Sequence, residues 1–178
     1  HQAMAAFYGE RARGGVALIV TGGFFPSENC LPAGAEPVFR QLDQIAKHRL
    51  ITDAVHQEGG KICLQILHTG RYSKQENLIA PSPIKSPINR FVPHAATLQQ
   101  IEQEIDNFAS FAEFCQRAGY DGVEIMGSEG YFINEFITMR TNQRTDEWGG
   151  SYENRIRLPL EIVRAVRHRV GPNFIIIF

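Results

Sequence analysis

The segment LQQIEQEIDNFASFAEFCQRAGYDGVEIMG, residues 98–127, decides the fold. Apolar side chains recur in its first part at steps of three and four, which predicts a helix over Leu98–Arg117 with Thr97 as the N-cap. Gly119 then closes the helix, because glycine readily takes the left-handed conformation found at helix ends. The apolar run Gly122–Met126 follows without alternation, as is typical of a strand covered on both faces of a parallel sheet. A long polar loop comes next.

This unit of helix, glycine turn, buried strand and loop recurs along the chain. Strands are predicted over Val16–Thr21, Lys61–Leu67, Gly122–Met126 and Phe174–Phe178, and the helices before them over Ala3–Arg13, Leu42–Gln57, Leu98–Arg117 and Tyr152–Arg169. Pro159 should kink the fourth helix or shift its start. The loops after the strands are long, at about Gly22–Gln41, His68–Thr97 and Gly127–Ser151. Because α/β folds keep their active sites at the carboxyl ends of parallel strands, we expect the site among these loops.

The repetition leaves a choice between a closed barrel and an open doubly wound sheet. No G-x-G-x-x-G or Walker A sequence follows a strand, so the fingerprints of two common nucleotide-binding open sheets are missing. A complete (β/α)₈ barrel needs eight strands and about 250 residues. We therefore expect an α/β chain that forms part of a (β/α)₈ TIM barrel, with about four parallel strands and helices outside. Residues 1–178 would be a segment of one domain, incomplete at both ends.

Composition argues against several classes of function. The 178 residues include 18 Lys+Arg and 19 Asp+Glu, for a net charge of −1, which disfavours a nucleic-acid or anionic-membrane surface. No apolar run approaches the roughly 18 residues of a membrane span. Three cysteines without a CxxC motif indicate neither a disulfide framework nor a zinc site, and the scattered histidines lack metal-ligand spacing. We expect a reduced, cytoplasmic chain without a metal.

The loop after the third predicted strand carries the most specific motif. It reads GSEGYFINEF over residues 127–136 and continues through RTN at 140–142 to RTDEWGGSYENR at 144–155. This combination resembles the flavin-dependent old yellow enzyme family. The segments LQILHTGR (64–71) and PSPIKSPINRFVPH (81–94) are most similar to its bacterial 2,4-dienoyl-CoA reductase branch. The resemblance covers essentially the whole chain.

The resemblance implies an FMN-dependent oxidoreductase with a small-molecule substrate. Hydride would pass from reduced nicotinamide through FMN to a conjugated C=C, here of a 2,4-dienoyl-CoA thioester in fatty acid β-oxidation. In that branch NADPH, FAD and an iron–sulfur cluster belong to a longer protein. Two alternatives remain. One is a related amine dehydrogenase, whose site needs aromatic residues around a cationic amine, and the other is an incomplete chain that binds no flavin tightly.

Tyr131 is the candidate proton donor. A phenol with a pKa of about 10 is protonated at neutral pH. It can transfer a proton to a carbon that becomes basic as hydride arrives beside it. In the family, the tyrosine of this GY pair has that role. The alternative is a tyrosine that packs its ring and hydrogen-bonds locally.

Gly23 and Gln65 are the candidate flavin-binding residues. The amide of Gln65, near the end of the second strand, donates and accepts side by side, which suits the pyrimidine edge of a flavin. Gly22 and Gly23 follow the first strand, and a missing Cβ lets a flat ring lie against backbone. In the resemblance, Gln65 and Gly23 match flavin-contacting positions. A glutamine satisfied by backbone and a plain tight turn are the alternatives.

Arg140 is the candidate substrate-binding residue. Its guanidinium suits a carbonyl, phosphate or carboxylate, and in the dienoyl-CoA branch it looks like a substrate-contacting arginine. The alternative is an ion pair with Glu129 or Glu135. Glu129 stands where the wider family has a His or Asn that holds the substrate carbonyl, a departure that fits the acyl-CoA branch. His68 could line the same pocket or be structural.

The remaining polar residues of the long motif are expected to brace the loop. Arg–carboxylate and amide hydrogen bonds would hold it through Arg144, Asp146, Asn154 and Arg155. Trp148 would plug the loop against the core. None of these side chains is assigned chemistry.

Overall fold

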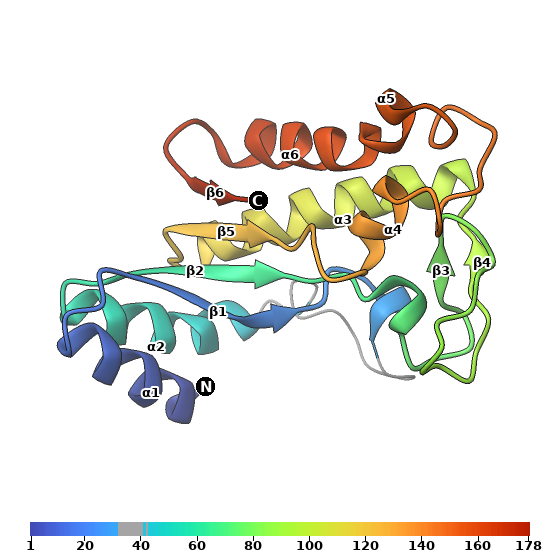
Figure 1. Cartoon of the computed structure of the whole chain (residues 1–178). Coiled ribbons are helices and arrows are strands. Elements are labelled where there is room, and N and C mark those ends of the chain that lie inside the picture. Colours follow the sequence, from blue (N-terminus) through green and yellow to red (C-terminus); the bar gives the residue numbers. More distant parts are fainter. Residues whose placement is uncertain (32–40, 42) are drawn as a thin grey trace.

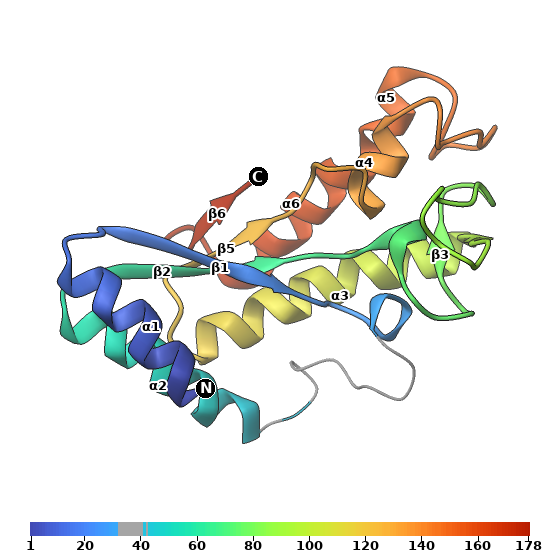
Figure 2. The ribbon, with the colours of Figure 1, turned by 60° about the horizontal axis from the view of Figure 1, so that its bottom comes forward.

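A parallel sheet and a layer of helices make up the computed structural model, which describes residues 1–31, 41 and 43–178. Within these residues the sheet has the order β1-β2-β5-β6, with β1 at Leu18–Phe24, β2 at Lys61–Ile66, β5 at Gly122–Ile125 and β6 at Ile175–Ile177 (Figure 1). The long helices are α1 (Gln2–Arg13), α2 (Asp43–Gln57), α3 (Leu98–Arg117) and α6 (Arg157–Val170). Each strand follows a helix, and Figure 2 shows α1, α2 and α3 along the same face of the sheet.

Short elements interrupt the loops after the strands. They are the 3₁₀ turns η1 (Glu28–Cys30) and η3 (Gly70–Tyr72), the two-residue strands β3 (Ile79–Ala80) and β4 (His94–Ala95), and the helices α4 (Phe132–Ile137) and α5 (Tyr152–Arg155). The sequence pattern predicts loop where the structure has η1, η3, α4 and the β3–β4 pair. These elements are too short to show a clear hydrophobic period, so tertiary contacts decide them.

The first strand extends further than its sequence pattern predicts. The predicted strand Val16–Thr21 ends before the glycine pair, whereas β1 includes it. Pairing with β2 shifts register between Val20 and Gly23 and then resumes with Gly23 opposite Gln65. The expectation that Gly22 and Gly23 follow the first strand is therefore wrong, and the alternative of a plain tight turn is not observed either. An irregularity of this kind keeps a strand paired through residues that read as a turn.

The fourth predicted helix is divided in two. Ile156 separates α5 from α6, so Pro159 is the third residue of a new helix. The first N–H groups of a helix have no partner within it, and a proline there costs no hydrogen bond. The predicted shift of the helix start is confirmed. Leu42, the first residue of the second predicted helix, lies outside the described residues.

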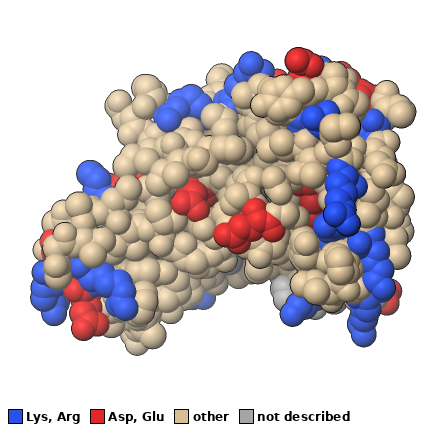
Figure 3. All heavy atoms as spheres, in the orientation of Figure 1, with Lys and Arg blue, Asp and Glu red and all other residues tan. Residues whose placement is uncertain are grey.

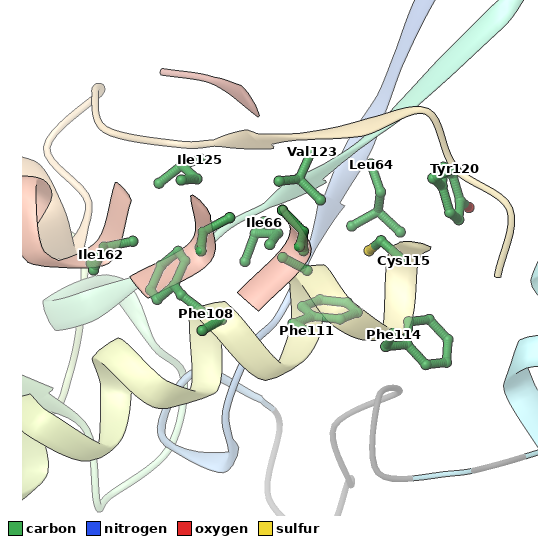
Figure 4. Packing of buried hydrophobic residues seen from close by; sticks show 14 of the residues in the cluster. Leu64, Ile66, Phe108, Phe111, Phe114, Cys115, Tyr120, Val123, Ile125 and Ile162 are labelled. Atoms are coloured by element: carbon green, nitrogen blue, oxygen red, sulfur yellow. The ribbon is translucent and has the colours of Figure 1, made fainter. Parts of the chain in front are cut away.

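The core lies between α3 and the sheet. Phe108, Phe111 and Cys115 of α3 point toward Leu64 and Ile66 of β2, and all five side chains are fully buried (Figure 4). Burying one such apolar side chain is worth about 1.5–3 kcal/mol. This packing fixes α3 along the sheet and thereby fixes the edge at which the loops emerge.

The two ends of α3 form as their sequence predicts. Thr97 Oγ1 accepts from the Gln100 N–H at 3.2 Å, and Gln100 Oε1 accepts from the Thr97 N–H at 2.9 Å, which makes a reciprocal capping box. After the helix, Gly119 has a φ of 85°, and an added Cβ would lie 2.9 Å from Thr52 Oγ1. Both the left-handed turn and the close approach of α2 therefore require glycine there.

We expect Thr97→Ala to lower the free energy of unfolding by about 0.5–2 kcal/mol, because the first turn of α3 loses its side-chain acceptor. Thr97→Ser, which keeps the acceptor, is the matched control. Chemical denaturation of the complete protein measures both. Equal stability of Thr97→Ala and the parent would show that the capping box contributes nothing.

Candidate active site

The carboxyl ends of β1, β2 and β5 meet at one edge of the sheet, as parallel pairing requires. Figure 1 shows η3, α4 and the β3–β4 pair gathered beyond that edge. Gly23 lies in β1, Gln65 lies in β2, and Tyr131 follows β5 as the N-cap residue of α4. The fold thus brings three of the four predicted site residues to the same end of the sheet.

Gly23 and Gln65 are direct neighbours. They are paired in register, and an added Cβ on Gly23 would lie 3.0 Å from Gln65 Oε1 and 2.8 Å from Leu67 Cδ2. Gln65 Nε2 donates to Glu124 Oε1 of β5 at 2.7 Å. The side-chain amide is therefore held by a carboxylate and not by backbone. The sequence analysis missed Glu124, although its polar side chain stands out in the apolar strand VEI.

This pair fits the pyrimidine edge of a flavin. Gly22 and Gly23 are both exposed, and an added Cβ on Gly22 would meet nothing within 4 Å. Bare backbone thus lies beside an amide whose Nε2 is already fixed by Glu124 and whose Oε1 faces Gly23. A flat, polar-edged ring suits this bare backbone and the amide beside it. Glu124 also lines a hollow of about 360 Å³ that reaches Phe178, and the described lining of that hollow includes neither Gly23 nor Gln65.

Tyr131 is half-buried and packs against Tyr72 of η3. The two ring centroids lie 5.8 Å apart, with the planes at 78°, an edge-to-face contact. Among the described residues, nothing hydrogen-bonds to the Tyr131 hydroxyl. The phenol is thus held by its ring while its O–H stays available. Tyr72 was not singled out from the sequence, where only its place after LQILHTGR could have pointed to it.

A cavity of about 250 Å³ opens beside this tyrosine pair. Its lining is Phe25, Cys30, Thr69, Tyr72, Ser73 and Lys74. Most of these side chains are apolar or neutral, and Lys74 is the charged one among the described lining residues. The cavity is therefore suited to an uncharged, elongated part of a ligand.

Arg140 is exposed and makes no hydrogen bond or ion pair with a described residue. The alternative of an ion pair with Glu129 or Glu135 is not observed within that part of the chain. Glu135 engages Arg71 instead, with Arg71 Nε 4.0 Å from Glu135 Oε1. Exposed Glu129 has a φ of 63°, the left-handed region. Among the described residues, Arg140 therefore has no hydrogen bond or ion pair with Gly23, Gln65 or Tyr131.

Glu135 is a buried acid that joins η3 to α4. Its side chain is buried, Oε1 accepts from the Arg71 N–H at 3.0 Å, and Oε2 has no hydrogen-bond partner. Burial raises the pKa of this carboxyl to about 8, which favours its protonated form around neutral pH. An added Cβ on Gly70 would lie 2.5 Å from Oε2. Glu135 thus holds η3, and with it Tyr72, against the start of α4.

His68 is a core residue and not a pocket-lining one. Its ring stacks on Phe132 at 4.1 Å, and its Nδ1 accepts from the Gly70 N–H at 3.0 Å. Nε2 lies 3.6 Å from Glu104 Oε2 of α3, and both side chains are buried. Burial lowers the pKa of His68. The structural alternative for this residue is therefore the one observed.

The long motif after α4 is braced as its sequence predicts. Arg144 donates to the carbonyls of Pro81 and Ala96 at 3.2 and 2.6 Å, and to Asp146 Oδ1 at 3.0 Å. These bonds fasten the loop to the segment that contains β3 and β4. Trp148 is buried, which confirms its place as a plug. Similar bonds to backbone carbonyls are made by Asn154 and Arg155.

The described residues contain no group of three or more His, Cys, Asp or Glu side chains arranged to hold a metal ion. In the same residues, no helix combines the length and apolarity needed to cross a membrane.

Comparison with known proteins identifies the family. The sequence model of the NADH:flavin oxidoreductase / NADH oxidase family matches residues 1–178. The chain belongs to the NADH:flavin oxidoreductase family. Among curated members, it is 38% identical to N,N-dimethylglycine/sarcosine dehydrogenase of Chromohalobacter salexigens, with 96% of this chain and 26% of that protein aligned. It is 37% identical to cinnamate reductase of Clostridium sporogenes, with 94% and 27% aligned.

Solved structures of this NADH:flavin oxidoreductase family share the fold. The old yellow enzyme homologue of Zymomonas mobilis superposes with a TM-score of 0.86 at 33% identity, over 96% of this chain and 51% of that one. A 2-naphthoyl-CoA reductase complex superposes with a TM-score of 0.89 at 28% identity. The match covers 99% of this chain and 29% of that one. The chain thus spans about a quarter of the length of the curated relatives named above and about half of the length of the old yellow enzyme homologue. The predicted fold, part of a (β/α)₈ barrel, is confirmed.

We expect Glu135→Gln to flatten the dependence of stability on pH. The folded chain keeps Glu135 protonated up to about pH 8, whereas an unfolded glutamate loses its proton near pH 4.5. The contribution of Glu135 to the stability of the parent is therefore largest below pH 4.5. This contribution is lost as the pH rises toward 8. Each pKa unit corresponds to about 1.4 kcal/mol, so the variant should gain at least about 1 kcal/mol over the parent between pH 5 and 8.

Denaturant unfolding of the complete protein at several pH values measures this difference. Glu102→Gln removes an exposed carboxyl of α3 and is the matched control. Parallel stability curves for Glu135→Gln and the parent would contradict the buried neutral acid.

Proposed function

We propose that this chain is part of an FMN-dependent ene-reductase in which Tyr131 supplies the proton. One observation carries the proposal: the Gly23–Gln65 pair and a phenol that no described residue hydrogen-bonds stand at the same edge of the sheet. Family membership supplies the cofactor class, since the family is one of NADH:flavin oxidoreductases. A relative named cinnamate reductase supports reduction of a conjugated C=C as the reaction class.

Each site residue has a defined part in this proposal. Gly23 and Gln65 hold the flavin, with Gln65 oriented by Glu124. FMN held by these residues would supply hydride chemistry toward the electron-poor carbon of the substrate. Tyr131 gives its hydroxyl proton to the neighbouring carbon, and Tyr72 keeps the donating ring in place. Alignment of donor and acceptor by a rigid sheet edge lowers the entropic part of the barrier.

We propose a 2,4-dienoyl-CoA thioester as the substrate. The acyl-CoA type is supported by a 2-naphthoyl-CoA reductase complex that is 28% identical and superposes closely. Glu129, in place of the carbonyl-binding His or Asn of the wider family, also fits this type. Arg140, exposed and unpaired among the described residues, would contact the thioester. NADPH, FAD and an iron–sulfur cluster remain predictions for the longer protein.

We further propose that residues 1–178 are a segment of one FMN-binding barrel domain. Within the sheet, β1 and β6 each have a single neighbour, and parallel edges of this kind are normally covered. Large apolar side chains lie exposed near both edges, among them Val16, Leu18 and Phe178. Without further strands to close the barrel, this segment would bind FMN weakly and be inactive by itself.

An amine dehydrogenase is the second candidate. It is favoured by the relative named N,N-dimethylglycine/sarcosine dehydrogenase and by the Tyr72–Tyr131 pair, since aromatic faces attract cationic amines. The cations around Tyr72 argue against it. The Arg71 guanidinium lies 5.4 Å from the Tyr72 ring centroid, and Lys74 lines the adjoining cavity. These two cations would repel a positively charged amine substrate.

We expect Gln65→Leu in the complete enzyme to weaken FMN binding by about 1–3 kcal/mol, because polar atoms of the flavin's pyrimidine edge would be buried without a hydrogen-bond partner. Titration of the apoprotein with FMN, followed by flavin fluorescence, measures the affinity. Gln116→Leu removes a glutamine of α3 that hydrogen-bonds to the Val170 carbonyl, away from the site, and should bind FMN as the parent does. Parent-like affinity of Gln65→Leu would remove Gln65 from the flavin site.

We expect Tyr131→Phe to slow only one half-reaction. Reduction of FMN by nicotinamide needs no proton from this residue and should proceed at the parent rate. Oxidation of the reduced flavin by the dienoyl-CoA substrate should slow by about 10²–10⁴, the usual effect of losing one general acid. Stopped-flow absorbance resolves the two steps. Equal slowing of both would make Tyr131 a packing residue, and no slowing of either would assign the proton to another acid or to water.

A further inference from the structure

A second hollow lies next to the candidate active site. It has a volume of about 380 Å³ and is lined by Lys74, Ile88, Asn89, Arg90 and Phe91. We call this hollow the Lys74–Arg90 groove. It runs between η3 and the segment that precedes β4, and nothing in the proposed reaction uses it.

The groove has a positive charge that no acid among its described lining residues offsets. Lys74 and Arg90 are exposed, and neither makes an ion pair with a described residue. The remaining lining offers apolar surface, since Ile88 is 86% exposed and Phe91 lies beside it. The Arg90 guanidinium lies 4.4 Å from the centroid of the Phe91 ring. Two cations beside an isoleucine and an aromatic ring match a ligand that combines phosphates with a flat base.

The groove is held in shape by hydrogen bonds. Asn89 Nδ2 donates to the Arg71 carbonyl at 2.9 Å and to the Ser73 carbonyl at 2.7 Å. The Asn89 Oδ1 accepts from the Phe91 N–H at 3.3 Å. These bonds join the 88–91 segment to the chain at 71–73, so the backbone on both sides of the groove is held in place.

The groove adjoins the cavity beside the tyrosine pair. Lys74 lines both the groove and the 250 Å³ cavity, and Tyr72, in the wall of that cavity, contacts Tyr131. The shared Lys74 therefore places the cationic groove next to the cavity, and Tyr72 places the cavity next to the proton donor. Figure 3 shows Lys and Arg side chains gathered over the side of the molecule where η3 and β3 lie.

We propose that the Lys74–Arg90 groove binds the phosphate-bearing nucleotide tail of the substrate, which in a coenzyme A thioester is the 3′-phosphoadenosine diphosphate. The proposal rests on the acyl-CoA substrate proposed above. The acyl group lies at Tyr131, the uncharged pantetheine arm fills the cavity beside Tyr72, and the phosphates lie between Lys74 and Arg90. Adenine packs on Ile88 and Phe91. The groove thereby selects thioesters of coenzyme A over smaller enoyl compounds.

The test uses charge reversal in the complete flavoprotein, with Lys74→Glu, Arg90→Glu and the double variant. Lys85→Glu is the matched control, because Lys85 is an exposed lysine in the same 81–94 segment that does not line the groove. Calorimetric titration with free coenzyme A measures affinity. Steady-state kinetics measure the ratio of kcat/KM for the dienoyl-CoA to that for the same dienoyl group on N-acetylcysteamine, which carries no phosphate.

We expect each reversal in the groove to weaken coenzyme A binding and to lower that ratio about tenfold, with a smaller effect at high salt. Lys85→Glu should match the parent. Coenzyme A affinity within twofold of the parent in the double variant overturns the proposal, as does equal weakening by Lys85→Glu. A rise in KM for NADPH with coenzyme A binding unchanged would assign the groove to the nicotinamide nucleotide. If the parent reduces no dienoyl-CoA, the proposed function fails, while the coenzyme A titration still decides the groove.

Discussion

The packing of α3 against β2 and β5 is the contact on which the rest of the structure depends. Phe108 and Phe111 lie against Leu64 and Ile66 with no exposed surface, and the helix runs the length of the sheet (Figure 4). Because this contact fixes the strands side by side, their carboxyl ends meet at one edge. The loops that carry the candidate site are long and irregular, and the rigid edge is what gives them a common position.

Two carboxyl groups at that edge, of buried Glu135 and half-buried Glu124, then set the positions of the site residues. Glu135 joins η3 to α4 as a neutral acid, and Glu124 orients the amide of Gln65. Both carboxyls act on a neighbouring residue. They fix the arrangement of Tyr72 with Tyr131 and of Gln65 with the glycine backbone, and burial of the Glu135 carboxyl opposes this stabilisation.

The charge distribution divides this end of the molecule into two parts. Acidic side chains lie over the end of β5 and the loop after it, whereas basic side chains lie over η3 and β3 (Figure 3). Lys74 and Arg90 stand in the basic part without acidic partners among the described residues. An electron-poor, phosphate-bearing substrate is consistent with this division, because its charged end is drawn away from the acids.

The sequence by itself determined the order of helices and strands, because the apolar period of Leu98–Arg117 and the glycine after it are local signals. It also marked Tyr131, Gln65 and Gly23, through a family resemblance. Only the tertiary structure decided that Gly23 lies inside β1 and beside Gln65, since a register shift between strands leaves no local pattern. The same holds for Tyr72 and Glu135, whose partners are far along the chain and whose roles arise from packing.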